Sequence, residues 1–238
     1  MEEEEFQEPP PPTPEKVARR ALVLSAVTCR SMIDDKQDPW AKEMSTQILE
    51  WLERLDLKKE LSEWEKALLT KPFGELSEKD RRDGSWLSEA MVILAWALGK
   101  TPLPSFDAQC DPPDVGSCLG FTQPIVETAL SSPQLLPREQ LSEYNEFIYN
   151  LHWRVRDHRL RGGPYDFESL ARKAWGEPIL RHGLKIIDKD IALGGIPLTQ
   201  APESARRSIT SITQERHRAS NWLIGYASED FYEVTTDT

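Results

Sequence analysis

The chain has 238 residues, of which 39% are hydrophobic, and its formal net charge is −11. This length can bury a core as one large domain or as two small ones. The longest apolar run, 90–98, is about half as long as a bilayer span, and residues 2–5 are acidic where a secretion signal is cationic. We therefore expect a soluble cytoplasmic protein without a membrane association.

The three cysteines, Cys29, Cys110 and Cys118, cannot all pair with one another. Reduced thiols are expected in a large acidic cytosolic chain. A bridge between Cys110 and Cys118, which share one loop, is the alternative. Cys29 lies in an apolar stretch and is expected to behave as a small buried hydrophobe.

The charge is unevenly distributed along the chain. Residues 34–115 hold eighteen acids and eleven bases, a net −7, whereas residues 151–218 hold thirteen bases and eight acids, a net +5. The two parts could complement each other across an internal interface, or the basic part could present a surface to an anionic ligand. The overall negative charge disfavours nucleic-acid binding.

The chain opens with a Glu- and Pro-rich tail, residues 1–13, that we expect to be disordered or extended. Thr13-Pro14 is a helix start, and apolar side chains up to about Ile33 occupy nearly every side of that helix, which predicts burial on more than one face. Asp38-Pro39 starts a second helix with an apolar stripe. The stripe consists of Trp40, Met44, Ile48, Trp51, Leu52 and Leu55.

Two further helices are predicted to start at Ser62 and Ser77, because each serine is followed three residues later by an acid that can complete a capping box. The second one leads into residues 85–98, the most apolar helix of the chain, and Gly99 ends it. Residues 100–123 are predicted to form a long loop.

The second half is predicted to contain four more helices. They follow Pro124, begin near Pro137, run from about Phe167 to Trp175, and run from about Pro202 to Tyr226. Residues 184–193 favour a β-hairpin turning near Asp188-Lys189, with a helix as the alternative. The pattern predicts a mainly α fold, an irregular multi-helix globular domain over 14–238 with one short β-hairpin, and loop 100–123 is the place for an internal boundary.

Glu89 is the first candidate for catalysis, because it lies in the most apolar helix. A buried carboxylate needs a charged or hydrogen-bonding partner, or its pKa rises until it is neutral. Glu89 could therefore be a general acid or base. We favour the ordinary alternative, a structural ion pair with Arg20 or with an arginine of the basic stretch 152–161.

The basic stretch His152–Arg161 holds two histidines, four arginines and an aspartate. Arg154, Arg156 and Arg159 could bind a phosphate or carboxylate, because a guanidinium offers a fork of donors. His152 is the acid or base candidate of this stretch. The two histidines are six residues apart and face different sides of a helix, so no shared metal is expected. We favour a solvated helix end that pairs with the acidic half.

The last helix places Arg216 on its apolar stripe, where partial burial is expected. A second, polar face contains Thr210, Thr213 or Gln214, His217 and Asn221. This face could bind a ligand through Arg216 and Asn221 or transfer a proton through His217. The ordinary polar face of an amphipathic helix, exposed to solvent, is the interpretation that we favour.

Dedicated motifs for metals, nucleotides and nucleophilic catalysis are absent from the sequence. It contains no His-Glu-x-x-His, no close cysteine pair, no Gly-x-Gly-x-x-Gly, no P-loop and no Gly-x-Ser-x-Gly. Neither a metal nor a cofactor is expected.

Three short stretches match a known pattern. They are Arg-Arg-Ala-Leu at 19–22, the helix from Ser85-Trp86 through Glu89 to Trp96-Ala97-Leu98-Gly99, and Glu215-Arg216 with Ala219-x-Asn221-Trp222-Leu223. Over most of residues 14–238 the chain resembles a bacterial family known as domain of unknown function 4272, and the acidic tail lies outside the resemblance. The resemblance implies a soluble bacterial protein and no particular activity.

These observations favour a non-enzymatic binding or interaction module with a protein partner. The alternative is a cofactor-free hydrolase or transferase that acts on an anionic small molecule. It requires Glu89, His152 and His217 to share one pocket with the basic arginines.

Overall fold

The computed structural model describes residues 9–176 and 181–238, with only the backbone for residues 127–129. By their contacts these residues form two compact units. The helical unit comprises Thr13–Pro102 and Cys110–Leu136, and the mixed unit comprises Leu103–Gln109, Pro137–Thr238 and the described part of the tail. The expectation that residues 14–238 fold as one domain stays a prediction.

The helical unit contains helices only. Its elements are α1 (Pro14–Ile33), α2 (Pro39–Arg54), η1 (Lys58–Glu60), α3 (Glu63–Thr70), α4 (Glu78–Ala97), α5 (Pro112–Cys118) and α6 (Val126–Ser131). The mixed unit combines helices with a small sheet. Its elements are α7 (Arg138–Arg161), α8 (Phe167–Trp175), η2 (Arg181–Gly183), β1 (Ile186–Ile187), β2 (Asp190–Leu193), β3 (Ile196–Pro197) and α9 (Glu203–Ile224).

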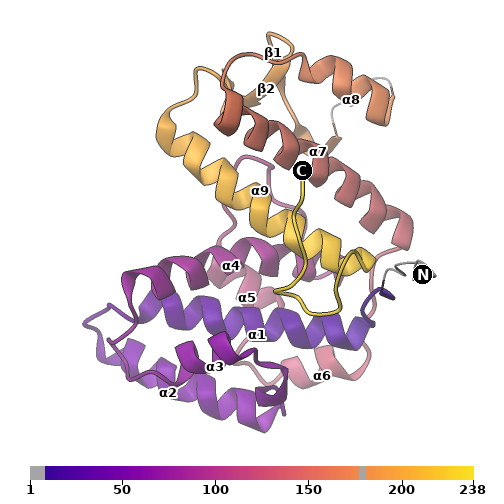
Figure 1. Ribbon diagram of the computed structural model, residues 1–238. Coiled ribbons are helices and arrows are strands. Elements are labelled where there is room, and N and C mark those ends of the chain that lie inside the picture. Colours follow the sequence, from indigo (N-terminus) through magenta and orange to yellow (C-terminus); the bar gives the residue numbers. More distant parts are fainter. Residues whose placement is uncertain (1–8, 177–180) are drawn as a thin grey trace, which may run out of the picture. The chain divides into compact units, whose positions relative to one another are not determined.

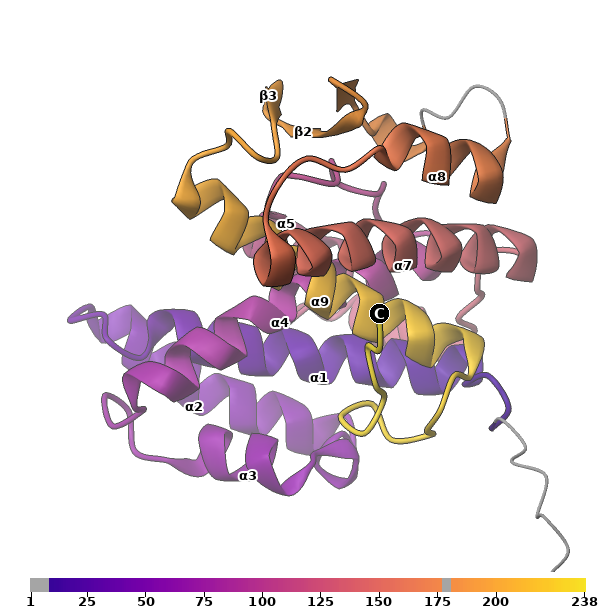
Figure 2. The same ribbon diagram turned by 45° about the horizontal axis from the view of Figure 1, so that its top comes forward.

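α1 is the central helix of the helical unit. It lies between α4 on one side and α2 and α3 on the other, and it also contacts α5 and α6 (Figures 1 and 2). Thr13 caps its start by accepting a hydrogen bond from the Lys16 N–H at 3.2 Å. Side chains on every side of α1 are buried, which confirms the predicted burial on more than one face.

Two arginines of α1 are buried and carry their charge into the core. Arg20 donates to the Glu65 carboxylate at 3.0 Å, and the same carboxylate accepts the Ser62 N–H at 2.8 Å, completing the predicted capping box of α3. Arg30 forms an ion pair with Asp34, one turn further along. Both charges are therefore compensated inside the core, as burial requires.

Asp34 fastens the loop 71–76 to the end of α1. Its two carboxylate oxygens accept the backbone N–H groups of Gly74 at 2.8 Å and Leu76 at 2.9 Å. Burial raises the pKa of Asp34, but the Gly74 N–H and the Arg30 guanidinium outweigh it and hold that pKa below its usual value. Asp34 is thus a structural carboxylate.

α4 crosses α1 closely at Gly84, inside the helix. A Cβ added to Gly84 would lie 2.0 Å from the Ser31 hydroxyl oxygen and 2.9 Å from the Ser31 Cβ. No side chain fits at this separation. The glycine therefore permits the close approach of the two most extensively packed helices of the unit.

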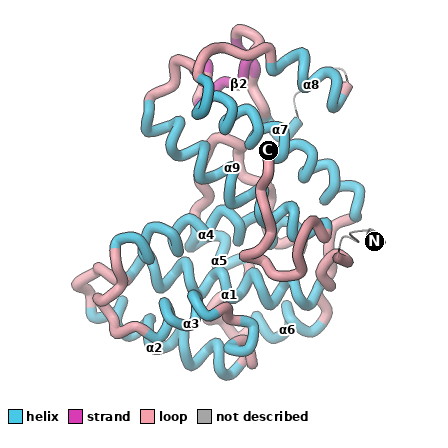
Figure 3. Tube along the Cα trace, in the orientation of Figure 1, coloured by secondary structure: helices cyan, strands magenta, loops and turns pink. Residues whose placement is uncertain are grey.

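The mixed unit places a small antiparallel sheet beside α8 at one end of the α7–α9 pair (Figure 3). β1 pairs with β2 in the register Ile187↔Asp190, so Asp188 and Lys189 form a two-residue turn. Both have positive φ, 52° and 67°, as a type I′ turn requires. The predicted hairpin and the mainly α class are confirmed, and β3, paired with β2, is an addition.

The sequence predicts a loop over residues 100–123, but α5 forms within them; Asp111 caps its start, and Pro112-Pro113 occupy its first positions. This is the helix start seen at Asp38-Pro39, followed by a helix too short to show a periodic pattern. Of the tail predicted as disordered or extended, residues 1–8 lie outside the described residues, and residues 9–12 contain neither helix nor strand. Among the described helices, none is long and apolar enough to cross a membrane.

We predict that Gly84→Ala destabilises the protein by about 1–3 kcal/mol, because overpacking between α1 and α4 outweighs the gain of about 1 kcal/mol in helix propensity. Gly116→Ala in α5 is the matched control, since its new Cβ would meet Phe121 at an ordinary 3.6 Å. The free energy of unfolding in urea measures both. A Gly84→Ala protein as stable as the control would contradict the close crossing.

Candidate functional site

The polar residues predicted on α7 and α9 meet in the mixed unit, where these two helices pack together (Figure 2). The Nδ1 atoms of His152 and His217 lie 3.0 Å apart, and the two side chains are 6% and 1% exposed. A hydrogen bond between two imidazole nitrogens requires one donor and one acceptor. The pair is therefore suited to share one proton between two neutral rings.

The electrostatic surroundings keep both rings neutral. Burial lowers the pKa of His152 to about 4, and the nearby Arg156 and Arg159 lower it as well. Burial lowers the pKa of His217 to about 3, with a further contribution from His152. Near neutral pH the pair is thus an uncharged part of the core.

Asn221 continues this buried polar seam toward the C-terminus. Its side chain donates to the Thr235 carbonyl at 2.9 Å and accepts from Asn145 at 2.7 Å. Arg156 donates to the Thr238 hydroxyl at 3.4 Å. The interpretation that His217 and Asn221 belong to an exposed polar face was wrong, because packing against α7 and the C-terminal segment buries them.

Two arginines predicted to bind a ligand hold the mixed unit together. Arg154, with 0% exposure, grips Asp190 of β2 through Nε at 2.8 Å and Nη2 at 2.5 Å. Arg216, 1% exposed, donates to the carbonyls of Ser105 at 2.9 Å and Ala108 at 2.7 Å. The expectation of a solvated side chain was wrong for Arg154, whereas Arg159 is exposed, and the expected pairing of this helix end with the acidic half stays a prediction.

Glu89 lies in α4 of the helical unit and is 1% exposed. Its carboxylate accepts the Cys110 N–H at 2.9 Å, which attaches the segment before α5 to α4. Arg20, one of its expected partners, is paired with Glu65. Glu89 and the two histidines belong to different units, and the catalytic roles considered for them stay untested hypotheses.

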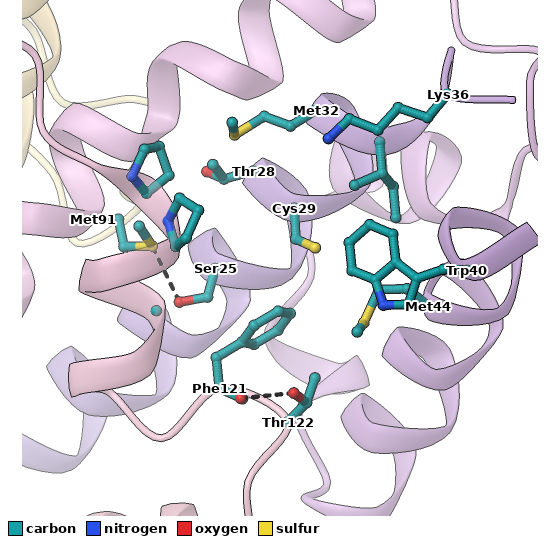
Figure 4. A pocket seen from close by; sticks show the side chains of 14 residues that line it. Ser25, Thr28, Cys29, Met32, Lys36, Trp40, Met44, Met91, Phe121 and Thr122 are labelled. Atoms are coloured by element: carbon teal, nitrogen blue, oxygen red, sulfur yellow. Dashed lines mark hydrogen bonds between the residues drawn. The ribbon is translucent and has the colours of Figure 1, made fainter. Parts of the chain in front are cut away.

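The sequence analysis missed an apolar pocket in the helical unit. It has a volume of about 240 Å³ and lies between α1, α2, α4 and α5 (Figure 4). Its lining includes Cys29, Met32, Trp40, Met44, Met91 and Phe121. In Figure 4, Met32 and Lys36 lie on one side of the space and Phe121 on the other. We call this space the methionine pocket.

The rim of the methionine pocket exposes large apolar side chains to solvent. Trp40 is 49% exposed and Met32 is 37% exposed. Trp40 and Met44 belong to the apolar stripe predicted for α2, but Trp40 is exposed, Met44 is only partly buried, and both line the pocket. Periodicity in the sequence identifies the apolar face of a helix, but it does not show how much of that face other elements bury.

The polar atoms of the pocket are occupied or inert. Burial raises the pKa of the Cys29 thiol to about 11, so it stays protonated and is a poor nucleophile. Cys29 is only partly buried, although the sequence analysis expects a buried residue. All three cysteines are free, which contradicts the alternative of a Cys110–Cys118 bridge. The Ser25 hydroxyl lies 2.9 Å from the Ala21 carbonyl. The pocket is thus suited to hold apolar groups.

The histidine pair should make the protein sensitive to acid. An unfolded histidine has a pKa near 6.5, whereas folded His152 and His217 have pKa values of about 4 and about 3. Below about pH 6.5 the unfolded state therefore binds more protons, and the free energy of unfolding falls as the pH drops toward 4. In urea unfolding at about pH 7 and about pH 5, His217→Gln should reduce this loss by about 2 kcal/mol. An unchanged pH dependence would count against a neutral pair.

Arg154 provides a second test. Arg154→Gln leaves Asp190 buried without its counter-charge, so we expect a loss of about 3–5 kcal/mol in the free energy of unfolding. Arg161→Gln is the control, because Arg161 is 80% exposed and pairs with Asp157 at 3.3 Å, and its loss should stay below about 1 kcal/mol. Urea titrations measure both variants, and equally small losses in the free energy of unfolding would show that the Arg154 ion pair does not stabilise the fold.

Comparison with known protein families gives a match over most of the chain. The profile of a domain family described as a domain of unknown function (DUF4272) matches residues 3–172. The match includes most of the tail, which the resemblance left outside, and it ends within α8, before α9. No curated protein and no solved structure matches the chain. Since the matched residues make up well over half of the sequence, the chain belongs to the DUF4272 family.

Proposed function

We propose that this chain is a soluble cytoplasmic binding module without catalytic activity, and that its methionine pocket takes up an apolar side chain of a partner protein. The observation that carries this proposal is the open apolar pocket with Trp40 and Met32 exposed at its rim. Exposed apolar surface that is hollowed in this way is typical of interaction sites.

The composition of the pocket fits a protein partner. Tryptophan is enriched among the residues that dominate protein–protein binding energy. Methionine side chains are flexible and polarizable, so Met32, Met44 and Met91 can adapt to the shape of an incoming group. Lys36, beside the apolar side chains, can pair with an acid of the partner.

The size of the pocket supports an anchoring side chain rather than a metabolite. Small-molecule sites usually enclose about 300–1,000 Å³, and the methionine pocket encloses about 240 Å³. A space of this size suits one large apolar side chain of a partner segment, with the rest of the segment lying across the rim. Such a central anchor in a pocket is the usual form of a binding hot spot.

Other observations support binding over the hydrolase alternative. The protonated Cys29 thiol and the bonded Ser25 hydroxyl leave the pocket without an activated nucleophile among the residues described. His152 and His217 are neutral, buried and directed at each other. The free cysteines support a reducing compartment such as the cytoplasm.

Selection of peptides from a random displayed library against the full chain tests this function. The bound peptides should share a large apolar residue, and its replacement by alanine should weaken binding about tenfold or more. Met44→Lys, which introduces a charge into the pocket, should cause a comparable loss. Fluorescence anisotropy of labelled peptides measures both affinities.

Ile125→Lys is the matched control, because Ile125 is 63% exposed and lies outside the lining of the pocket. It should leave peptide affinity unchanged. Peptides that bind Met44→Lys as tightly as the unmodified chain, or a library that yields no anchored peptide, would refute the proposed function.

A further inference from the structure

A second pocket lies in the mixed unit, between the last turns of α7 and the first turns of α9. Its volume is about 530 Å³, which is within the usual range of small-molecule sites. Val155 and Leu198, both buried, supply apolar wall. Arg159 of α7 and Arg206 and Arg207 of α9 supply positive charge. We call this space the arginine pocket.

The positive charge of the arginine pocket is only partly neutralised. Arg207 pairs with Glu203, which also lines the pocket, at 2.6 Å. Among the described residues, neither Arg159 nor Arg206 forms an ion pair with a carboxylate, because the nearby acids Asp157 and Glu203 pair with other arginines. Two guanidinium groups from two different helices therefore face one space without a counter-ion from the chain.

Further donors complete the arrangement. Ser211 lines the pocket and can offer its hydroxyl as a donor, and His158 lines the pocket as well. The pocket also adjoins the first turns of α9, a helix of 22 residues whose N-terminus carries partial positive charge. Guanidinium N–H donors, a hydroxyl donor and the positive end of a helix dipole are the groups that commonly bind oxyanions in proteins.

We propose that the arginine pocket binds a small molecule that carries a multiply charged oxyanion, either a phosphoryl group or several carboxylates. Arg159 of α7 and Arg206 of α9 hold the anionic group, Ser211 donates a hydrogen bond to it, and the apolar wall at Val155 and Leu198 contacts the uncharged remainder. This site is separate from the methionine pocket in unit, in residues and in ligand chemistry.

Isothermal titration calorimetry of the full chain with pyrophosphate and, separately, with citrate tests the site at an ionic strength of about 0.15 M. Saturable one-site binding of at least one anion is expected. Arg159→Gln and Arg206→Gln should each weaken it about tenfold or more, because each removes a charge-assisted hydrogen bond. Arg206→Lys keeps the charge without the fork and should retain part of the affinity.

Arg161→Gln is the matched control, since it removes the same charge two residues from Arg159 at a side chain that is 80% exposed and outside the pocket lining. It should change the affinity less than about twofold, because exposed charges are screened at this salt concentration. Thermal unfolding of each variant verifies that the fold is retained.

Binding of pyrophosphate alone would identify a phosphoryl ligand, and binding of citrate alone would identify a carboxylate ligand. Either result supports the site. Equal weakening by Arg161→Gln and Arg206→Gln would reduce the binding to general charge attraction and overturn the proposal. Absence of saturable binding for both anions would also overturn it. Met44→Lys should leave anion binding intact, so the failure of one pocket does not imply the failure of the other.

Discussion

The need to compensate two buried arginines on α1 constrains the whole helical unit. α1 is covered on nearly all sides, so Arg20 and Arg30 can remain charged only if carboxylates reach them inside the core. Glu65 brings the start of α3 to Arg20, and Asp34 brings the loop before α4 to Arg30. With α3 and this loop fastened in place, the face of α1 that carries Ser25, Cys29 and Met32 is left to form a wall of the methionine pocket.

Buried charges in the mixed unit are compensated as well. Arg154 is neutralised by Asp190 across a helix–strand contact, and Arg216 donates hydrogen bonds to two backbone carbonyls. The histidine pair avoids the cost of buried charge by remaining neutral. The polar residues that the sequence grouped as one binding surface are thereby divided. The buried ones connect secondary-structure elements, and the more exposed Arg159 and Arg206 remain available at the surface.

The two pockets differ in the kind of group that they suit. The methionine pocket has an adaptable apolar wall in an all-helical unit, whereas the arginine pocket has fixed positive charge over a small apolar wall. The two pockets share no lining residue and belong to different compact units, so a substitution in the lining of one leaves the lining residues of the other unchanged.

Local chemistry determined the helices, because caps, proline starts, glycine stops and apolar periodicity act over a few residues. Thr13-Pro14, Ser62 and Gly99 mark helix ends in the sequence and in the structure alike, and the Asp188-Lys189 turn marks the hairpin. What the sequence could not determine depends on contacts between distant residues. The packing of the helices decides that Arg20 pairs with Glu65 and that His152 meets His217. It also leaves Trp40 and Met44 of the α2 stripe to line a pocket. Periodicity shows that a face is apolar, and only tertiary structure decides whether it is covered or open.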